Sequence, residues 1–316
     1  MEFKKYTKKK YNIFFHSKLK HIKVEWYFGN VCDYKECSYC LNKYTYNEYY
    51  RNMTKKETDK TIKFINSLKG VYDLLYIGGE PSTFKYLIYS IKKIKHNCRI
   101  NIMSNAQNEK FIKKVLSMGT KERPVIVSAT PHYEIYLKDK EKFIKHLNNL
   151  FKIAKKYKFG ELEFNVLLDK EKTKCYKEMI EYLYHVGYKK YGVPILTSFV
   201  RRDRSTKETI KNFVATEIFD EELKTFMQKD LLGSRTNFLK CNKYYGETCP
   251  ALEHYLYIRL DGKIDGTSCP QEIITKKSIF DDDFNLEEEK QLVKQTCICK
   301  HQPNNGICGI AHGFPP

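Results

Sequence analysis

The chain of 316 residues lacks a long apolar run: no stretch reaches the roughly 18 consecutive apolar residues that a membrane-spanning helix needs. Its basic N-terminal segment also lacks an apolar stretch that ends in a small-residue cleavage site, so we expect no signal peptide. Internal repeats of a fixed period and low-complexity linkers are absent as well. We therefore expect a globular protein with a cytoplasmic location, no membrane partner and a sizeable core built from its 41% hydrophobic residues.

Acidic residues are scarce relative to basic ones. The chain has 38 Asp and Glu against 57 Lys and Arg, which gives a net charge of +19. Such a charge is typical of proteins that bind nucleic acid, anionic surfaces or acidic substrates. The lysines are spread along helix-like segments, however, and Lys, Tyr, Ile and Asn are abundant throughout, as an AT-rich genome would produce. The net charge therefore has two possible explanations, compositional drift and a functional basic surface.

Cysteine is abundant instead, with 11 residues in a chain for which we expect no secretion signal. Cytosolic thiols stay reduced, so this number favours metal or cluster ligation over disulfides. Three cysteines lie close together near the N-terminus, and two, Cys98 and Cys175, lie alone in the middle. The other six follow residue 240. We expect Cys98 and Cys175 to be ordinary half-buried thiols.

Strand-like and helix-like segments alternate between residues 21 and 197. Short apolar runs that suit strands buried on both faces alternate with amphipathic segments, a pattern typical of parallel βαβ units. Six such units are too few for a closed eight-unit barrel of about 250 residues, so the pattern predicts an α/β fold built on a partial, open (β/α)6 barrel of the TIM type. The predicted strands are 22–31, 71–79, 99–104, 123–129, 161–168 and 189–197, and the predicted helices are 55–70, 83–95, 108–119, 138–158 and 170–187.

The pattern changes after residue 198. A helix is expected at 220–233, and a β-hairpin at 255–268, with Asp261-Gly262 as a two-residue type I′ turn. The acidic run 281–290 is interpreted as the solvated start of a helix. The predicted domains are a basic segment (1–20), the partial barrel (21–200), connecting helices (201–240) and a small Cys-rich α+β extension (241–316).

Cys32, Cys37 and Cys40 follow directly after the first predicted strand. Three thiolates in one loop are typical of a metal or iron–sulfur site. Three cysteines leave one iron of a four-iron cubane without a protein ligand, and this iron is open to a substrate or cofactor. Half of a zinc site and incidental thiols are the alternatives.

Gly78, Gly79, Glu80 and Pro81 follow the second predicted strand. Glycines allow a ligand to approach the backbone closely, and the Glu can accept hydrogen bonds from a cationic group. Alone this stretch is most simply a turn. Because the carboxyl ends of parallel strands carry the chemistry in such folds, however, it is expected to face the cysteine triplet.

Together the two motifs resemble those of the radical S-adenosylmethionine (radical SAM) superfamily, whose partial barrel the six βα units also match. The resemblance implies a [4Fe–4S] cluster on the three cysteines, with S-adenosylmethionine bound to the open iron. One electron would cleave the sulfonium bond to give a 5′-deoxyadenosyl radical, which abstracts a hydrogen from substrate. Glu80 and the glycines would hold the methionine amino group, and Tyr39 would lie near the adenine. The cysteine spacing departs from the usual family pattern by one extra residue between the first two cysteines, which affects the expected loop geometry.

Polar residues at further strand ends fit the same site. Ser104, Asn105, Ser128 and Asn165 are candidate contacts for ribose, methionine carboxylate or adenine, although each is equally well explained as a satisfied polar residue. His132 follows the fourth strand and could touch substrate, but a lone loop histidine is more often structural.

The C-terminal cysteines resemble the twitch or SPASM extensions of the same superfamily, which carry auxiliary iron–sulfur clusters. The resemblance implies one auxiliary [4Fe–4S] cluster, and a structural zinc is the alternative, which His301 or His312 could join. The candidate ligands are Cys249, Cys269, Cys297, Cys299 and Cys308, with Cys241 left over.

The sequence therefore leaves three candidate functions for the chain. The first is a radical SAM enzyme that acts on a peptide or protein and takes electrons from a donor such as flavodoxin or ferredoxin. The second performs the same chemistry on a nucleotide, a tRNA base or a small metabolite, which the positive charge favours mildly. The third is a zinc-stabilised nucleic-acid-binding module. It accounts for the cysteines and the charge, but not for the Gly-Gly-Glu stretch or the six βα units.

Overall fold

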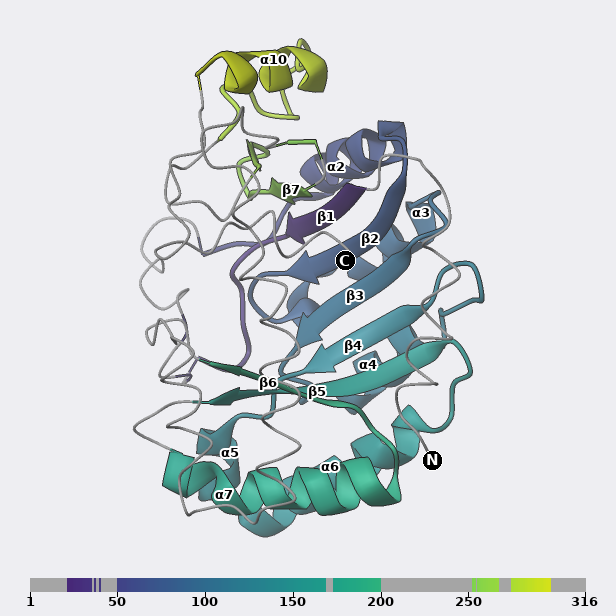
Figure 1. Ribbon diagram of the computed structural model, residues 1–316, viewed down its shortest axis with the longest axis vertical. Helices are drawn as coiled ribbons and strands as arrows, with labels where there is room; N and C mark the ends of the chain where they lie inside the picture. Colours follow the sequence, from purple (N-terminus) through teal and green to yellow (C-terminus); the bar gives the residue numbers. More distant parts are fainter. Residues whose placement is uncertain are drawn as a thin grey trace.

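An eight-stranded, mostly parallel sheet organises the computed structural model (Figure 1). Its strand order is β6-β5-β4-β3-β2-β1-β7-β8, and neighbours from β6 to β7 run parallel. The structure describes residues 22–35, 37, 40, 50–168, 173–199, 252–253, 255–266 and 274–296. The strands are β1 (Ile22–Tyr27), β2 (Val71–Ile77), β3 (Arg99–Ser104), β4 (Val125–Ala129), β5 (Gly160–Leu168), β6 (Ile195–Phe199), β7 (Tyr255–Ile258) and β8 (Ile264–Asp265).

Helices alternate with the first six strands, as the sequence predicted, and one face of each strand packs toward them. Val24 and Trp26 of β1 and Phe164 of β5 are fully or almost fully buried on this side. The sheet stays open, so the predicted partial (β/α)6 barrel is confirmed. The helices are α2 (Lys55–Ser67), α3 (Leu87–Lys93), α4 (Glu109–Leu116), α5 (Tyr133–Lys138), α6 (Lys140–Ala154), α7 (Thr173–Tyr182) and α10 (Leu286–Thr296), with a 3₁₀ turn, η3 (Pro81–Thr83).

The sixth strand begins later than predicted. A π-helical segment, η4 (Leu183–Lys190), continues α7 through the residues that the sequence assigned to the start of this strand. Gly187 within it packs so closely on the Phe151 ring of α6 that a Cβ would lie 2.9 Å from it. Strand β6 begins only after Pro194, which has no backbone N–H for a sheet hydrogen bond. The short helix α5 was also not predicted.

The predicted hairpin is present, but its turn is of another kind. Gly262 N donates to Arg259 O, and Arg259 N donates to Lys263 O, so the loop has three residues rather than two. Gly262 alone is left-handed, at φ 76°, whereas a type I′ turn needs positive φ at both central residues. The turn is therefore a bulged one, and the type I′ prediction was wrong.

The hairpin extends the barrel sheet, because β7 pairs in parallel with β1. Tyr255 of β7 donates its hydroxyl hydrogen to Glu25 of β1 at 2.7 Å. The following segment packs on α2, where the rings of Phe64 and Phe284 meet edge-on at 5.7 Å. The described part of the C-terminal region is thus continuous with the barrel, while the domain boundaries stay a prediction.

The acidic run 281–290, which leads into the first turns of α10, is only partly solvated. Glu289 is 6% exposed, and its carboxylate accepts hydrogen bonds from the backbone N–H groups of Lys276 and Lys277. The expectation of a wholly solvated helix start was therefore wrong at this residue. The predicted helix 220–233 lies outside the described residues, as does the segment 1–20. None of the helices in the described part is both long and apolar enough to cross a membrane.

The core around Phe151 generates the first prediction. This ring is fully buried against Phe164, Tyr182 and Tyr191. Phe151→Ala should lower the free energy of unfolding by about 3–5 kcal/mol, because it removes apolar contacts and leaves a cavity. Urea denaturation followed by circular dichroism measures the change.

The matched control is Leu137→Ala, since Leu137 is 63% exposed. We expect it to change the free energy of unfolding by less than about 0.5 kcal/mol. Equal effects of the two variants would contradict the placement of Phe151 in the core.

Candidate functional site

The carboxyl ends of β1, β2, β3 and β4 meet at one edge of the sheet. Three polypeptide segments converge there: the cysteine-bearing loop after β1, which we call the Cys loop (28–40), the Gly-Gly-Glu-Pro stretch after β2, and Ser104-Asn105 at the end of β3. Neighbouring parallel strands bring these segments together, as the sequence predicted.

The two glycines after β2 lie in direct backbone contact with the start of the Cys loop. Gly79 N donates to Gly29 O and Glu80 N donates to Val31 O, both at 2.8 Å. A Cβ on Gly78 would lie 2.2 Å from Gly29 O, and one on Gly79 would lie 2.0 Å from Val31 O. Side chains at these positions would therefore push the two segments apart, which explains why both are glycine.

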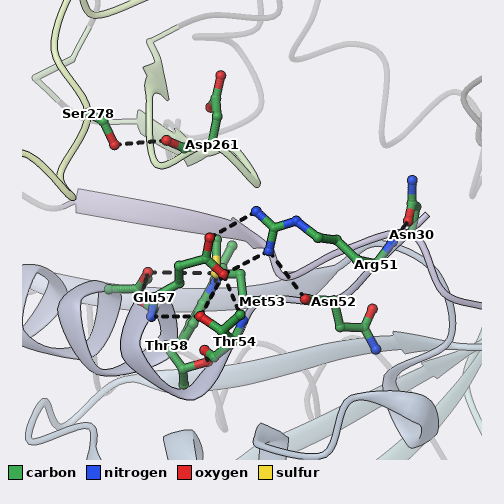
Figure 2. A network of polar contacts seen from close by, with 11 residues as sticks. Asn30, Arg51, Asn52, Met53, Thr54, Glu57, Thr58, Asp261 and Ser278 are labelled. Carbon is green, nitrogen blue, oxygen red and sulfur yellow. Dashed lines mark hydrogen bonds and ion pairs between the residues drawn. The ribbon is translucent and has the colours of Figure 1, made fainter. Parts of the chain in front are cut away.

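A second segment, 50–53, holds the opposite side of the Cys loop (Figure 2). Arg51 N donates to Asn30 Oδ1 at 2.8 Å, and Met53 N donates to Phe28 O at 2.8 Å. Cys32 N donates to the Tyr50 hydroxyl, which in turn donates to Cys32 O, both at 3.0 Å. Both backbone polar groups of the first cysteine are thereby fixed.

The segment 50–53 is anchored in turn to the first turn of α2. The guanidinium of Arg51 donates two parallel hydrogen bonds of 2.8 Å to the Glu57 carboxylate (Figure 2). Glu57 also forms a capping box with Thr54, which begins the helix. Burial raises the pKa of Glu57, but the hydrogen bonds from Arg51 and Thr54 outweigh this effect and leave the pKa lowered.

Glu80 joins the ends of β2 and β3. Its side chain is 2% exposed. Oε1 accepts hydrogen bonds from Ser104 Oγ at 2.8 Å and Ser82 N at 3.1 Å, and Oε2 accepts one from Asn105 N at 2.7 Å. Burial raises the pKa of Glu80 in spite of these three donors. The carboxylate is thus a connecting group in the structure, with one acceptor position left on Oε2.

A further side-chain bond ties the Cys loop to β3. Asn105 Nδ2 donates to Asp33 Oδ1 at 2.8 Å. Asp33 directly follows the first cysteine of the loop, so the loop is held from three sides: by segment 50–53, by the glycine stretch and by the end of β3.

The three thiols of the Cys loop are only partly accessible. Cys37 is buried, while Cys32 and Cys40 are half-buried. Cys40 N donates to Cys37 O at 3.2 Å, which closes a turn between the last two cysteines. Burial raises the pKa of Cys32 to about 11, and burial together with charge repulsion from Cys40 raises the pKa of Cys37 further.

This donor set fits an iron–sulfur cluster. Thiols with raised pKa values need a cationic centre to become thiolates together, and thiolate sulfur is the ligand that iron–sulfur clusters take. Within the described residues, no three His, Cys, Asp or Glu side chains already lie at metal-binding distances.

Of the remaining predicted site residues, three lie in the described part of the chain and the others do not. Pro81 is buried at the start of η3. Ser128 and Asn165 lie on the face of the sheet opposite the helices, because their neighbours Val127, Phe164 and Val166 point into the helix-facing core. The Asn165 Oδ1 atom is buried and has no hydrogen-bond partner in the described part of the chain. Tyr39 and the candidate auxiliary ligands Cys249, Cys269, Cys297, Cys299 and Cys308 lie outside the described residues.

The site also contains His132, which the sequence marked as a candidate substrate contact or, more simply, as a structural loop histidine after β4. It is 6% exposed, and its Nδ1 atom lies 3.3 Å from Cys37 Sγ. The Tyr34 ring packs on it at a centroid distance of 4.7 Å. Burial lowers the pKa of His132 to about 4. The sequence signal for this histidine was a polar residue shortly after a buried strand, three positions beyond the last residue of β4. For Tyr50 we find no such signal.

Comparison with protein families supports the same class of protein. The model of the Radical SAM superfamily matches residues 26–183, which is half of the chain. The chain therefore belongs to the radical SAM superfamily and is an enzyme. A search of the curated proteins found no match.

Solved structures share the fold at low sequence identity. The structure of Streptococcus suis SuiB bound to S-adenosylmethionine has a TM-score of 0.53 and 15% identity, and the match covers 89% of this chain and 67% of that one. The structure of SuiB bound to the precursor peptide SuiA has a TM-score of 0.51 and 16% identity, and the match covers 90% of this chain and 67% of that one. The structure of hexahistidine-tagged anSMEcpe with bound AdoMet has a TM-score of 0.50 and 13% identity, and the match covers 78% of this chain and 73% of that one.

The backbone contact at the glycine pair generates a prediction. Gly79→Ala places a methyl group where Val31 O lies, so the Cys loop must move away from β2. We expect this variant to lose most of the iron bound by anaerobically reconstituted wild type, and to lose about 2–3 kcal/mol of unfolding free energy. Iron analysis and urea denaturation measure the two effects.

Gly192→Asn serves as the control, because a Cβ at Gly192 meets nothing within 4 Å and Asn tolerates its φ of 67°. It should keep its iron. Full iron content in Gly79→Ala would contradict the proposed dependence of the Cys loop on this contact.

Proposed function

We propose that the chain is a radical SAM enzyme that cleaves S-adenosylmethionine reductively and abstracts a hydrogen atom from a peptide or protein. The observation that carries the proposal is the Cys loop, held at the carboxyl ends of β1 to β3 beside the Gly-Gly-Glu stretch with its buried Glu80. Family membership implies both the [4Fe–4S] cluster and S-adenosylmethionine.

Cys32, Cys37 and Cys40 would hold the cluster. When bound, the cluster supplies the electron that cleaves the sulfonium carbon–sulfur bond of S-adenosylmethionine and so generates the 5′-deoxyadenosyl radical. The chain's own contribution is to fix the loop: Tyr50 holds the backbone of Cys32, and Asn105 holds Asp33. Hydrogen bonds that orient the ligand-bearing backbone favour a cluster of defined geometry.

The methionine part of the cofactor would lie along the Gly-Gly-Glu stretch. Glu80 has one acceptor position left on Oε2 after its three internal hydrogen bonds, and this position can take an N–H of the methionine amino group. Ser104 and Asn105 would then act mainly by orienting Glu80. Ser128, Asn165 and Tyr39 are the proposed contacts for the ribose and adenine.

The sheet face opposite the helices would receive the substrate. This face carries polar side chains, with a Lys23–Glu25 ion pair at 2.8 Å and an Arg99–Asp73 ion pair at 2.8 Å toward the amino ends of the strands. Polar, hydrogen-bonding walls suit a peptide, whose backbone presents a donor and an acceptor at nearly every residue. SuiB, which shares the fold, is described as bound to its precursor peptide, and this likeness supports a peptide substrate here.

The C-terminal cysteines would hold an auxiliary [4Fe–4S] cluster near the substrate. The described hairpin supports this, because the β7–β1 pairing brings residues 255–265 to the edge of the barrel sheet, and Cys249 and Cys269 flank this hairpin in sequence. A cytoplasmic location and an electron donor such as flavodoxin or ferredoxin complete the proposal.

Replacing Cys32, Cys37 and Cys40 together by Ala should abolish the formation of 5′-deoxyadenosine from S-adenosylmethionine under anaerobic, reducing conditions. The reason is that no other set of thiols lies at the end of the Gly-Gly-Glu stretch in the described part of the chain. Liquid chromatography of the reaction mixture measures the product.

Cys98→Ala is the matched control, since Cys98 is a buried thiol just before β3 and outside the site. It should retain the activity of wild type. Product formation by the triple variant would refute the assignment of the catalytic cysteines.

Metal analysis tests the second cluster. Two [4Fe–4S] clusters give about eight irons per chain, and the variant with Cys249, Cys269, Cys297, Cys299 and Cys308 replaced by Ala should keep about four. About four irons in wild type would refute the auxiliary cluster. Zinc without iron would refute the radical mechanism as a whole.

A further inference from the structure

The imidazole of His132 lies against the sulfur of Cys37. Its Nδ1 and Nε2 atoms lie 3.3 Å and 3.8 Å from Cys37 Sγ, so the nearer nitrogen is within hydrogen-bond distance of a sulfur acceptor. Both residues are 6% exposed, which keeps water from competing for the contact.

The ring of His132 is held in this position by its surroundings. It comes from the N-terminal end of α5, directly after β4, while the cysteine comes from the loop after β1. Tyr34 of the Cys loop packs on the ring at a centroid distance of 4.7 Å and an interplanar angle of 31°. The Cys loop thus supplies both a sulfur and an aromatic ring to the same histidine.

We infer that His132 donates an Nδ1–H hydrogen bond to the Cys37 sulfur and thereby raises the reduction potential of the cluster held by the Cys loop. Reduction adds negative charge to the sulfurs of an iron–sulfur cluster, so a donor at one of them stabilises the reduced form more than the oxidised form. His132 is in this sense a positioning and tuning residue, which acts through Cys37. The inference rests on the proposed function, because it requires the cluster.

A matched pair of variants isolates the hydrogen bond. Asn and Leu have nearly the same size, and an Asn amide nitrogen can occupy the position of the histidine Nδ1, whereas Leu has no donor. His132→Leu should shift the midpoint potential of the cluster to a more negative value by about 59 mV, which is a tenfold change in the one-electron equilibrium. His132→Asn should recover most of the wild-type potential.

The measurement is an anaerobic spectroelectrochemical or EPR-monitored titration of the reconstituted protein, without S-adenosylmethionine or substrate. His96→Leu is the control, because His96 contacts the carbonyl of Ile65 at 2.8 Å and lies outside the site. It should leave the potential unchanged. Equal potentials for wild type and His132→Leu, or equal shifts for the Leu and Asn variants, would overturn the inference.

A measurement on the wild-type chain covers the case in which the variants fail to fold. Protein labelled with ¹⁵N-histidine should show a weak nitrogen coupling in the pulsed EPR spectrum of the reduced cluster, as expected for a nitrogen one hydrogen bond away from sulfur. No coupling would overturn the inference, and so would the strong coupling of a nitrogen bonded directly to iron. If the wild type forms no iron–sulfur cluster, the proposed function itself fails. Failure of the proposed function is thus distinguished from failure of the inference about His132.

Discussion

The contact on which the site depends is a backbone contact between two loops. Gly79 and Glu80 donate their N–H groups to Gly29 and Val31, so the segments after β1 and β2 lie as close together as two adjacent strands would. Only glycine fits at 78 and 79, because a Cβ at either position would meet a carbonyl oxygen at about 2 Å. This contact fixes where the Cys loop begins, and every proposed role of its thiols depends on that starting point.

Buried polar groups surround this contact. The Glu80 carboxylate is removed from water, which costs several kcal/mol, but each hydrogen bond to a charged group contributes about 1.5–3 kcal/mol in return. Its three donors come from η3 and from the end of β3. Asn105 then links β3 to Asp33 of the Cys loop, and Arg51 with Glu57 anchors the opposite side. Neutral and charged partners together therefore fix residues 28–33 of the Cys loop.

Most of the barrel was predictable, because hydrophobic periodicity defines its strands and helices and parallel strand ends must meet at one edge. From these two rules the sequence alone places Cys32 at the same edge of the sheet as Gly78 and Ser104. Periodicity does not determine exact strand boundaries or the partner of an added strand, because both depend on tertiary packing. The start of β6 depends on how Gly187 packs against Phe151. The pairing of β7 with β1 depends on which edge of the sheet is left open by the other strands.

The same limit applies inside the site. The sequence suggested Glu80 as a direct ligand of the cofactor, but two of its three donors, Ser104 and Asn105, come from the end of the neighbouring strand, where only the fold places them. Tyr50 and Cys32 are separated by 18 residues, and Cys37 and His132 by 95, so no local pattern reveals either pair. The turn at Gly262 was misjudged for a local reason, since Asp-Gly occurs in bulged turns as well as in type I′ turns.

In the proposed function, the Cys loop holds a four-iron cluster with one iron open to S-adenosylmethionine. This cluster is tested by the EPR spectrum of the anaerobic, reduced protein before and after S-adenosylmethionine is added, in a variant without the five candidate auxiliary cysteines. We expect a single [4Fe–4S]⁺ signal whose g values shift when S-adenosylmethionine binds. A signal that is unchanged by S-adenosylmethionine, or no iron–sulfur signal at all, would contradict it.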